Sequence, residues 1–116
     1  MTNENSPEER FAKSASDHGR YTIEGNAPLV NRAYRSLVSA LRELRSKPDK
    51  GVLFLKGLLS DNDPSVVVWA ATYLLPFDEE EAIFALEKIA DTGIPRLAFS
   101  AKVTLQEWKA RRLSVE

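Results

Sequence analysis

A chain of 116 residues is the size of one small domain with a single hydrophobic core. Hydrophobic residues make up 43% of it and charged residues 28%, proportions typical of a soluble globular protein. The net charge of -1 gives no general attraction to nucleic acid or to anionic membranes. Because the sequence lacks cysteine, disulfides, thiolate catalysis and zinc–thiolate sites are excluded.

The start of the chain favours a cytoplasmic location. Residues 1–11, MTNENSPEERF, are polar and acidic and lack the apolar stretch of a secretory signal. No run of about 18 apolar residues occurs, so we expect no contact with a membrane through a spanning helix. We expect residues 1–5 and 114–116 to be flexible tails on either side of a single domain that covers residues 6–113.

The first helix is expected to begin directly after Ser6. Ser6 is a favourable N-cap, Pro7 suits the first helical position, and two glutamates follow where the helix dipole stabilises acid. The helix ends near His18 or continues toward Gly25. Asn26 then caps a second helix, which is expected to end near residue 47. Its apolar residues recur at steps of three and four and form an amphipathic stripe: Val30, Ala33, Leu37, Leu41 and Leu44.

The middle of the chain predicts two further helices. Asp49 is expected to cap the third, which carries apolar residues as far as Leu59. Asp63 caps the fourth, which begins at Pro64 and continues to about Leu75. This helix is apolar nearly all round, a pattern typical of a helix at the centre of a stack.

The last two helices are also marked by their ends. Asp78 is expected to cap the fifth helix, and Gly93 is expected to end it as a C-cap. Pro95 is expected to open the sixth helix, which carries Trp108 near its end. The sequence therefore predicts an all-α fold of about six helices.

Two stretches of the chain match each other at a fixed offset of 31 residues. The matched pairs are Leu55 with Leu86, Leu58 with Ile89, Pro64 with Pro95, Val66 with Leu97, Ala70 with Ala101 and Leu74 with Leu105. Self-similarity over tens of residues indicates stacked supersecondary units. The repeat therefore predicts a short stack of helical hairpins.

The segment LKGLLSDNDPSVVVWAATYLL, residues 55–75, resembles a HEAT repeat. The resemblance lies in the leucines of the first helix, the Asp-Pro turn, and the small and branched residues of the second helix. Val67 stands where HEAT repeats often carry arginine, and the offset is shorter than the roughly 40 residues of a HEAT unit. "HEAT-like" is therefore the closer description.

Residues 11–108 also resemble a family of small bacterial proteins of unknown function with this HEAT-like fold. The motifs that carry this resemblance are GNAPLVNRAYRSL, DNDPSV, AATYLLPFDEEEA and the closing tryptophan helix. The resemblance implies a HEAT-like stack of helical hairpins and brings no catalytic residues with it. Some similar small helical-repeat proteins are immunity proteins that neutralise antibacterial toxins.

Trp69 and Tyr73 are candidate anchors for a partner protein. They lie four residues apart, so they share one face of the fourth predicted helix. The equivalent residues of the second copy, Ser100 and Thr104, are polar, which suggests a local role for the aromatic pair. Tryptophan and tyrosine are common at binding hot spots. The alternative is that both pack inside the protein against the second helix.

Charged residues supply two further candidate surfaces. A basic stripe on the second helix consists of Arg32, Arg35, Arg42 and Arg45, of which the first three are the candidate contact residues. This stripe either is solvated, makes internal ion pairs, or meets a protein or nucleic acid partner. Glu79 and Glu80 belong to an acidic run that either stabilises a helix start or meets a basic partner.

The sequence favours a non-enzymatic protein-binding module, in particular an immunity-type protein that binds and blocks a toxin. The alternatives are a nucleic-acid-associated repeat protein that uses the basic stripe, or a general scaffold. No nucleophile–base pair, phosphate loop or metal-ligand cluster is present, so we predict no catalytic residue, cofactor or metal. His18 is the only histidine, which excludes a histidine-rich metal site. The oligomeric state stays open.

Overall fold

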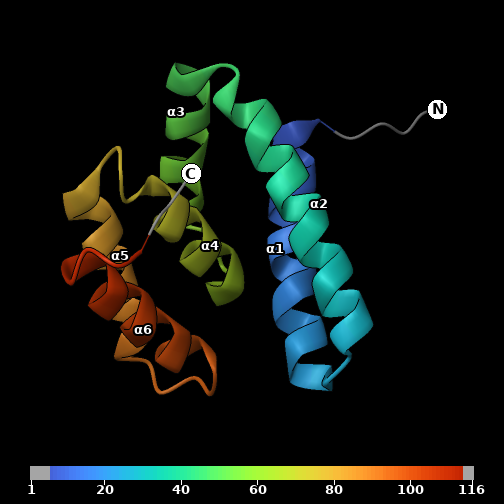
Figure 1. Ribbon diagram of the computed structural model, residues 1–116, viewed down its shortest axis with the longest axis vertical. Helices are drawn as coiled ribbons and strands as arrows, with labels where there is room; N and C mark the ends of the chain where they lie inside the picture. The colour runs from blue at the N-terminus through green and yellow to red at the C-terminus, as the bar shows by residue number, and fades with distance from the viewer. Residues whose placement is uncertain (1–5, 114–116) are drawn as a thin grey trace. The chain divides into compact units, whose positions relative to one another are not determined.

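The computed structural model describes residues 6–113, and over this range its regular secondary structure is entirely helical. The elements are α1 (Pro7–Glu24), α2 (Ala27–Arg45), α3 (Pro48–Leu58), α4 (Pro64–Leu74), α5 (Glu79–Ala90) and α6 (Leu97–Lys109) (Figure 1). The predicted all-α fold with about six helices is confirmed.

The helices fall into two compact units, Met1–Phe54 and Leu55–Glu116, with the boundary inside α3. The single domain over residues 6–113 stays a prediction, and the predicted tails at residues 1–5 and 114–116 lie outside the described residues.

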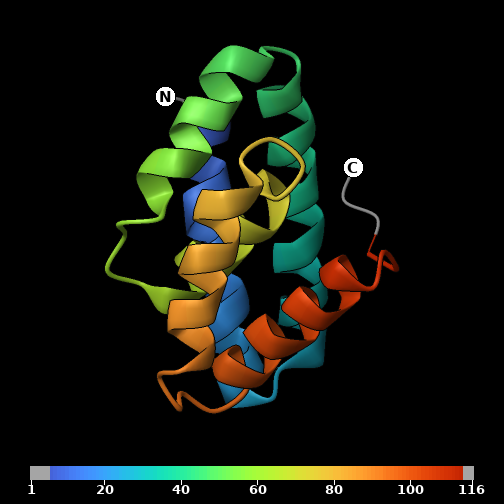
Figure 2. The same ribbon diagram turned by 90° about the vertical axis from the view of Figure 1, so that its left-hand side faces the viewer.

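The first unit is built on an antiparallel hairpin of α1 and α2 (Figures 1 and 2). The Ser6 hydroxyl accepts a hydrogen bond from the Glu9 amide at 3.1 Å, and the Glu9 carboxylate accepts one from the Ser6 amide at 3.2 Å. This reciprocal pair is a capping box. Gly25 ends α1 at φ 73°, a left-handed conformation that glycine adopts without strain. The longer of the two predicted extents of this helix is therefore correct.

Aromatic and small residues fill the core of this hairpin unit. The Phe11 side chain is fully buried, and its ring meets the Phe54 ring edge to face, with centroids 6.3 Å apart at 83°. Ser14 is also buried and donates a hydrogen bond to the Ser36 hydroxyl at 2.9 Å, so its polar atom is satisfied. The remaining buried residues of α1 and α2 are Ala15, Ala33, Leu37, Ala40, Leu41 and Leu44.

The start of α3 lies unusually close to the end of α2. A Cβ atom added at Gly51 would be 2.7 Å from the Leu44 carbonyl oxygen, so only glycine fits without a backbone shift. The prediction that Asp49 caps α3 is wrong, because the helix already begins at Pro48 and Asp49 lies in its first turn. Proline is favoured at the first helical position, since its missing N–H would have no helical partner there.

In the second unit, α4 contacts both α5 and α6. The Asp63 carboxylate accepts a hydrogen bond from the Ser65 amide at 2.9 Å, which confirms it as the N-cap of α4. Asp61 in turn accepts from the Asp63 amide at 2.8 Å and orders the turn before the helix. Most of α4 is buried, as its apolar sequence predicts: Ser65, Val66, Val67, Val68, Ala70, Ala71 and Leu74.

The α5–α6 hairpin differs from the prediction at the connection between its helices (Figure 2). Asp78 caps α5 as predicted, but α5 ends at Ala90 and its C-cap is Asp91, in a right-handed conformation, so the predicted C-cap at Gly93 is wrong. The α6 helix begins at Leu97, two residues after Pro95. The Leu97 amide donates to the Pro95 carbonyl at 2.7 Å around Arg96, whose φ is 68°. This γ-turn stores backbone strain that a non-glycine residue must bear.

A left-handed residue also closes α6 at its other end. Arg111 has a φ of 62°, and its amide donates to the Trp108 carbonyl at 3.0 Å. The Arg112 amide reaches the Glu107 carbonyl at 2.8 Å, which completes a Schellman motif. The Arg112 guanidinium also binds both oxygens of the Glu107 carboxylate, at 3.0 and 2.9 Å.

The 31-residue repeat corresponds to shared core positions within the second unit. Three matched pairs are buried in both copies: Leu55 with Leu86, Ala70 with Ala101, and Leu74 with Leu105. The aromatic mismatch is equally clear, because Trp69 is half-buried while Ser100 is exposed. The residues that recur at the 31-residue offset are thus mainly buried packing residues, whereas the residue type at other positions differs between the two copies.

Candidate functional site

The outer face of α2 carries the predicted basic stripe. Arg32, Arg35 and Arg42, which we call the α2 arginines, are all exposed, whereas Arg45, the fourth arginine of the predicted stripe, is half-buried. Their helical positions lie opposite the buried stripe that includes Ala33 and Leu37, so burial of that stripe directs the guanidinium groups to solvent.

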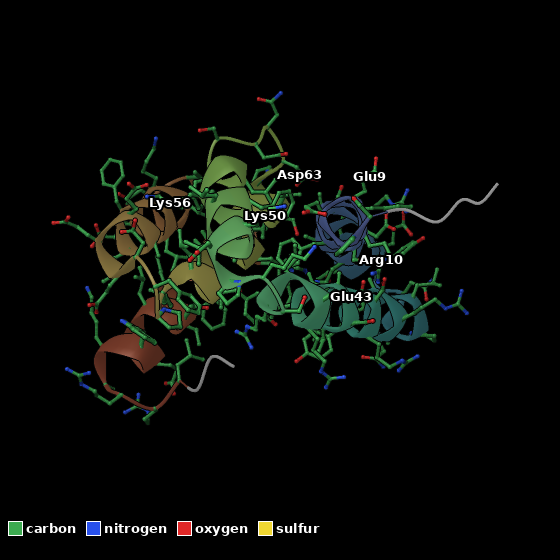
Figure 3. The ribbon with its side chains drawn as sticks, turned by 90° about the horizontal axis from the view of Figure 1, so that it is seen from above. Glu9, Arg10, Glu43, Lys50, Lys56 and Asp63 are labelled. Atoms are coloured by element: carbon green, nitrogen blue, oxygen red, sulfur yellow. The ribbon has the colours of Figure 1, made fainter. Side chains whose placement is uncertain are left out.

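Within residues 6–113, no α2 arginine forms an ion pair. Glu43 interrupts the stripe in the sequence, but its carboxylate binds the Arg10 guanidinium on α1 (Figure 3). The nearest acid on α2 is thus neutralised by the neighbouring helix. The α2 arginines therefore form an uncompensated positive surface on the described part of the hairpin unit.

Trp69 and Tyr73 form a stacked pair in the second unit. Their ring centroids are 5.9 Å apart and their planes differ by 20°, which confirms the predicted shared face of α4. Both side chains are half-buried. The aromatic pair and the α2 arginines are thus two separate candidate surfaces, each within its own unit.

The acidic run at the start of α5, residues 78–81, is held largely by internal contacts. The Lys56 ammonium lies 3.0 Å from the Asp78 carboxylate and 3.7 Å from that of Glu81. The hydrogen bond from Lys56 lowers the pKa of Asp78, and the same hydrogen bond, with the charges of Asp78 and Glu81, raises the pKa of Lys56. These carboxylates therefore help to fix α3 relative to α5 inside the second unit.

The two predicted contact residues in this run have different surroundings. Glu79 accepts a hydrogen bond from the Trp108 indole N–H at 2.8 Å, so it links the start of α5 to the end of α6. Glu80 is exposed and has no hydrogen bond or ion pair among the described residues. The sequence interpretation offered the carboxylates of both Glu79 and Glu80 to a basic partner. Of these two, only that of Glu80 has no bond to another described residue.

The structure identifies one surface that the sequence analysis missed. Glu80, Phe84, Glu87 and Asp91, which we call the α5 stripe, follow one another at steps of four, three and four residues, so they share one face. All four are exposed, and the Phe84 side chain is 64% exposed despite its size. Lys88 lies at the edge of the stripe, with its ammonium 5.6 Å from the Phe84 ring centroid. The spacing of these residues is present in the sequence, but the exposure of Phe84 is shown only by the structure.

The first unit also contains a surface pocket of about 310 Å³. It lies where the start of α1, the end of α2 and the start of α3 meet, near Lys50 in Figure 3. Its charged lining is mixed: Glu8, Glu43, Lys47 and Lys50. The lining also includes Ser46, whose hydroxyl donates a hydrogen bond to the Glu43 backbone carbonyl at 2.6 Å.

No metal-binding group and no membrane-crossing helix are found in the described range. No cluster of three His, Cys, Asp or Glu residues there is arranged to hold a metal ion. No described helix combines the length and the apolar character needed to span a bilayer. His18 is half-buried in α1, and this burial lowers its pKa.

Comparisons with protein-family models, with curated proteins and with solved structures give no match to this chain. The functional conclusion therefore depends on the surfaces described above. They belong to a small protein whose described residues, 6–113, form six helices.

Proposed function

We propose that this chain is a HEAT-like, non-enzymatic protein-binding module that docks through the α2 arginines onto an acidic surface of a partner protein. The observation that carries the proposal is the exposure of three arginines without an ion-pair partner among the described residues. Complementary charge accelerates encounter and excludes partners of the wrong sign. Arginine is also enriched at binding hot spots, since its planar guanidinium pairs with carboxylates through two hydrogen bonds.

The HEAT-like part of the proposal is supported by the repeat in the second unit. Matched residues of the two copies are buried in both, as expected when similar helical pairs stack. The resemblance to immunity-type helical-repeat proteins gives the proposal its specific form, in which the partner is a toxin that the chain binds and blocks. A scaffold or adaptor with the same basic face is the broader form.

Trp69 and Tyr73 are also proposed contact residues, secondary to the α2 arginines. Their stacking keeps two large rings on one face of α4, an arrangement suited to a preorganised apolar anchor. Glu79 and Glu80 are likewise proposed contacts, and Glu80 is the better of the two because Glu79 is already bonded to Trp108.

A nucleic-acid partner is the second candidate, since exposed arginines also bind phosphate. Its observation is the same: three unpaired guanidinium groups along one helical face in the described range. Each phosphate contact makes affinity fall steeply with salt. A gel-shift titration with DNA and RNA at low salt tests this candidate. The absence of any shift excludes it.

The decisive test is affinity capture from the organism that encodes the chain. We expect wild type to recover one partner stoichiometrically, with the product of a neighbouring toxin-like gene as the first candidate. The double reversal R35E/R42E should lose this partner. The matched control K13E/K102E changes two exposed lysines off the α2 face and should retain it. Recovery of no stoichiometric protein contradicts the function, and equal recovery by R35E/R42E contradicts the site.

A further inference from the structure

The chain carries two exposed helical faces of opposite charge, one in each unit. The described part of α2 presents the α2 arginines, and α5 presents the acids of the α5 stripe around Phe84. Counted over whole units, Met1–Phe54 has nine basic and seven acidic side chains, a net charge of +2. Leu55–Glu116 has seven basic and ten acidic side chains, a net charge of -3. The two faces are therefore complementary in sign.

The charges on the two faces also have matching spacing. Arg35 and Arg42 are seven residues apart on α2, and Glu80 and Glu87 are seven residues apart on α5. Seven residues of α-helix advance about 10.5 Å and return to nearly the same face. Two ion pairs can therefore form at once between such helices, either parallel or antiparallel.

The remaining residues favour the antiparallel arrangement. With Arg42 opposite Glu80 and Arg35 opposite Glu87, Arg32 comes opposite Ala90, one residue from Asp91, which can supply a third ion pair. In the parallel arrangement Arg32 comes opposite Phe77, before the start of α5, and the adjacent Asp78 is already paired with Lys56. The antiparallel register gives each of the three α2 arginines an acid of the α5 stripe, although Glu87 also lies 4.0 Å from the Lys109 ammonium of its own chain.

The apolar centre of the α5 stripe fits the same register. Phe84 lies between Glu80 and Glu87, so it comes opposite Val38 and Ser39 between the two arginines of α2. Val38 is half-buried and apolar, and Ser39 is small and exposed, so a ring can lie between the flanking ion pairs. Such an apolar centre with a charged rim is the usual composition of a protein interface.

We propose that the α2 face of one copy of this chain docks antiparallel on the α5 stripe of a second copy. Each copy carries both halves of the contact, which is the requirement for self-association through unlike surfaces. The inference rests on the proposed function for its α2 face, and it adds a competitor there: a second copy covers the arginines that the partner protein needs. Binding of the partner protein and binding of a second copy at this α2 face are then mutually exclusive.

The test measures the mass of the purified full chain by sedimentation from about 10 µM to about 1 mM, the range suited to contacts built on a few exposed ion pairs. At about 50 mM salt the mean mass should rise above the 13.0 kDa of one chain as concentration increases. At about 500 mM salt it should return toward 13.0 kDa, because screening weakens exposed pairs. A mass that stays at 13.0 kDa throughout the low-salt series overturns the proposal.

Charge reversal tests the two faces separately. R35E/R42E and E80R/E87R should each weaken self-association at least about tenfold, and K13E/K102E should not. An equimolar mixture of the two reversed proteins should associate again, since the unaltered α5 face of the first meets the unaltered α2 face of the second. A mixture that stays monomeric, with both proteins helical by circular dichroism, overturns the proposal. If either reversal loses helix content, R35Q/R42Q and E80Q/E87Q replace the pair under the same criterion.

A third charge reversal distinguishes this inference from the proposed function. E87R/D91R leaves the proposed contact Glu80 and the α2 face unchanged, so it should lose self-association yet still capture the partner protein. If the wild-type chain does not self-associate but still captures the partner protein, only the inference is overturned. Double variants with one reversal on each face test the register. R42E/E80R should self-associate more strongly than R42E/E87R, because the antiparallel register places residue 42 opposite residue 80. The opposite order overturns the antiparallel arrangement.

Discussion

The two units of this protein use their surface charges in different ways. In the first unit, Glu43 pairs with Arg10 and leaves the α2 arginines without an ion pair in the described range. In the second unit, three acids of the run 78–81 have internal partners: Lys56 pairs with Asp78 and Glu81, and Trp108 donates to Glu79. A run of charge in a sequence is therefore a poor measure of free surface charge. What decides is whether a neighbouring helix supplies a counter-ion.

The largest expected effect concerns the core of the first unit. Phe11→Ala should lower the free energy of unfolding by about 3–5 kcal/mol, because it removes a fully buried ring and leaves a cavity beside Phe54. Phe84→Ala in the second unit is the control, since that ring is exposed and should cost less than about 0.5 kcal/mol. Urea unfolding followed by circular dichroism measures both. Similar costs for the two variants would contradict the burial of Phe11.

The next effect compares two glycines of α3 that belong to different units. Gly51→Ala should destabilise by about 1–3 kcal/mol, because its Cβ would meet the Leu44 carbonyl oxygen and force the backbones apart. Gly57→Ala has no atom within 4 Å and should stabilise by about 0.5–1 kcal/mol through helix propensity. Thermal unfolding of both variants measures the difference. A stabilised Gly51→Ala protein would disprove the close approach.

A smaller effect of opposite sign is expected at the γ-turn before α6. Arg96→Gly should raise the free energy of unfolding by about 1 kcal/mol, because glycine adopts φ 68° without the strain that arginine bears. Lys102→Gly, in the exposed interior of α6, should instead cost about 1 kcal/mol. Opposite shifts of the melting temperature are the expected pattern. Two downward shifts would show that Arg96 is not strained.

The smallest effect tests the charge comparison itself. Lys56→Gln removes the partner that lowers the pKa of Asp78, so it should lower stability at neutral pH more than Arg35→Gln does. The stabilisation from Asp78 is present above its unfolded pKa of about 3.9 and is lost as pH falls through the lower folded pKa. The stabilisation from Lys56, whose pKa is raised, is present below its unfolded pKa of about 10.4 and is lost as pH rises through the folded pKa.

Melting temperatures measured from acid to alkaline pH check this prediction. Wild type should lose stability at both ends of the range, and Lys56→Gln should show a flatter curve at each end. Arg35→Gln should follow the wild-type curve, because its guanidinium has no ion-pair partner among the described residues. Identical curves for wild type and Lys56→Gln would show that the pair contributes nothing to folding.

Local signals in the sequence predicted most helix starts. Ser6, Asn26, Asp63 and Asp78 act as N-caps because capping depends only on residues two or three positions away. The stacking of Trp69 on Tyr73 followed from helical spacing for the same reason. The exceptions were Asp49, where proline took the first helical position, and Pro95, where a γ-turn delayed the helix.

Contacts between helices were beyond such reasoning. The bond from Trp108 to Glu79 joins residues 29 positions apart, and the Arg10–Glu43 pair joins residues 33 apart. Which acid meets which base at these separations depends on packing angles that no local pattern encodes. The exposed state of the α2 arginines could be proposed from periodicity, but their lack of ion pairs required the structure.

The close approach at Gly51 has a consequence for how this protein tolerates variation. Every amino acid except glycine carries the same Cβ atom, and that atom alone would meet the Leu44 carbonyl oxygen. In a saturation mutagenesis scan, replacements at position 51 should form a plateau of similar, poor fitness whatever their size or charge. Position 57, which is open, should instead rank its substitutions by helix propensity. The two profiles together would reveal, without coordinates, where two backbones lie nearly in contact.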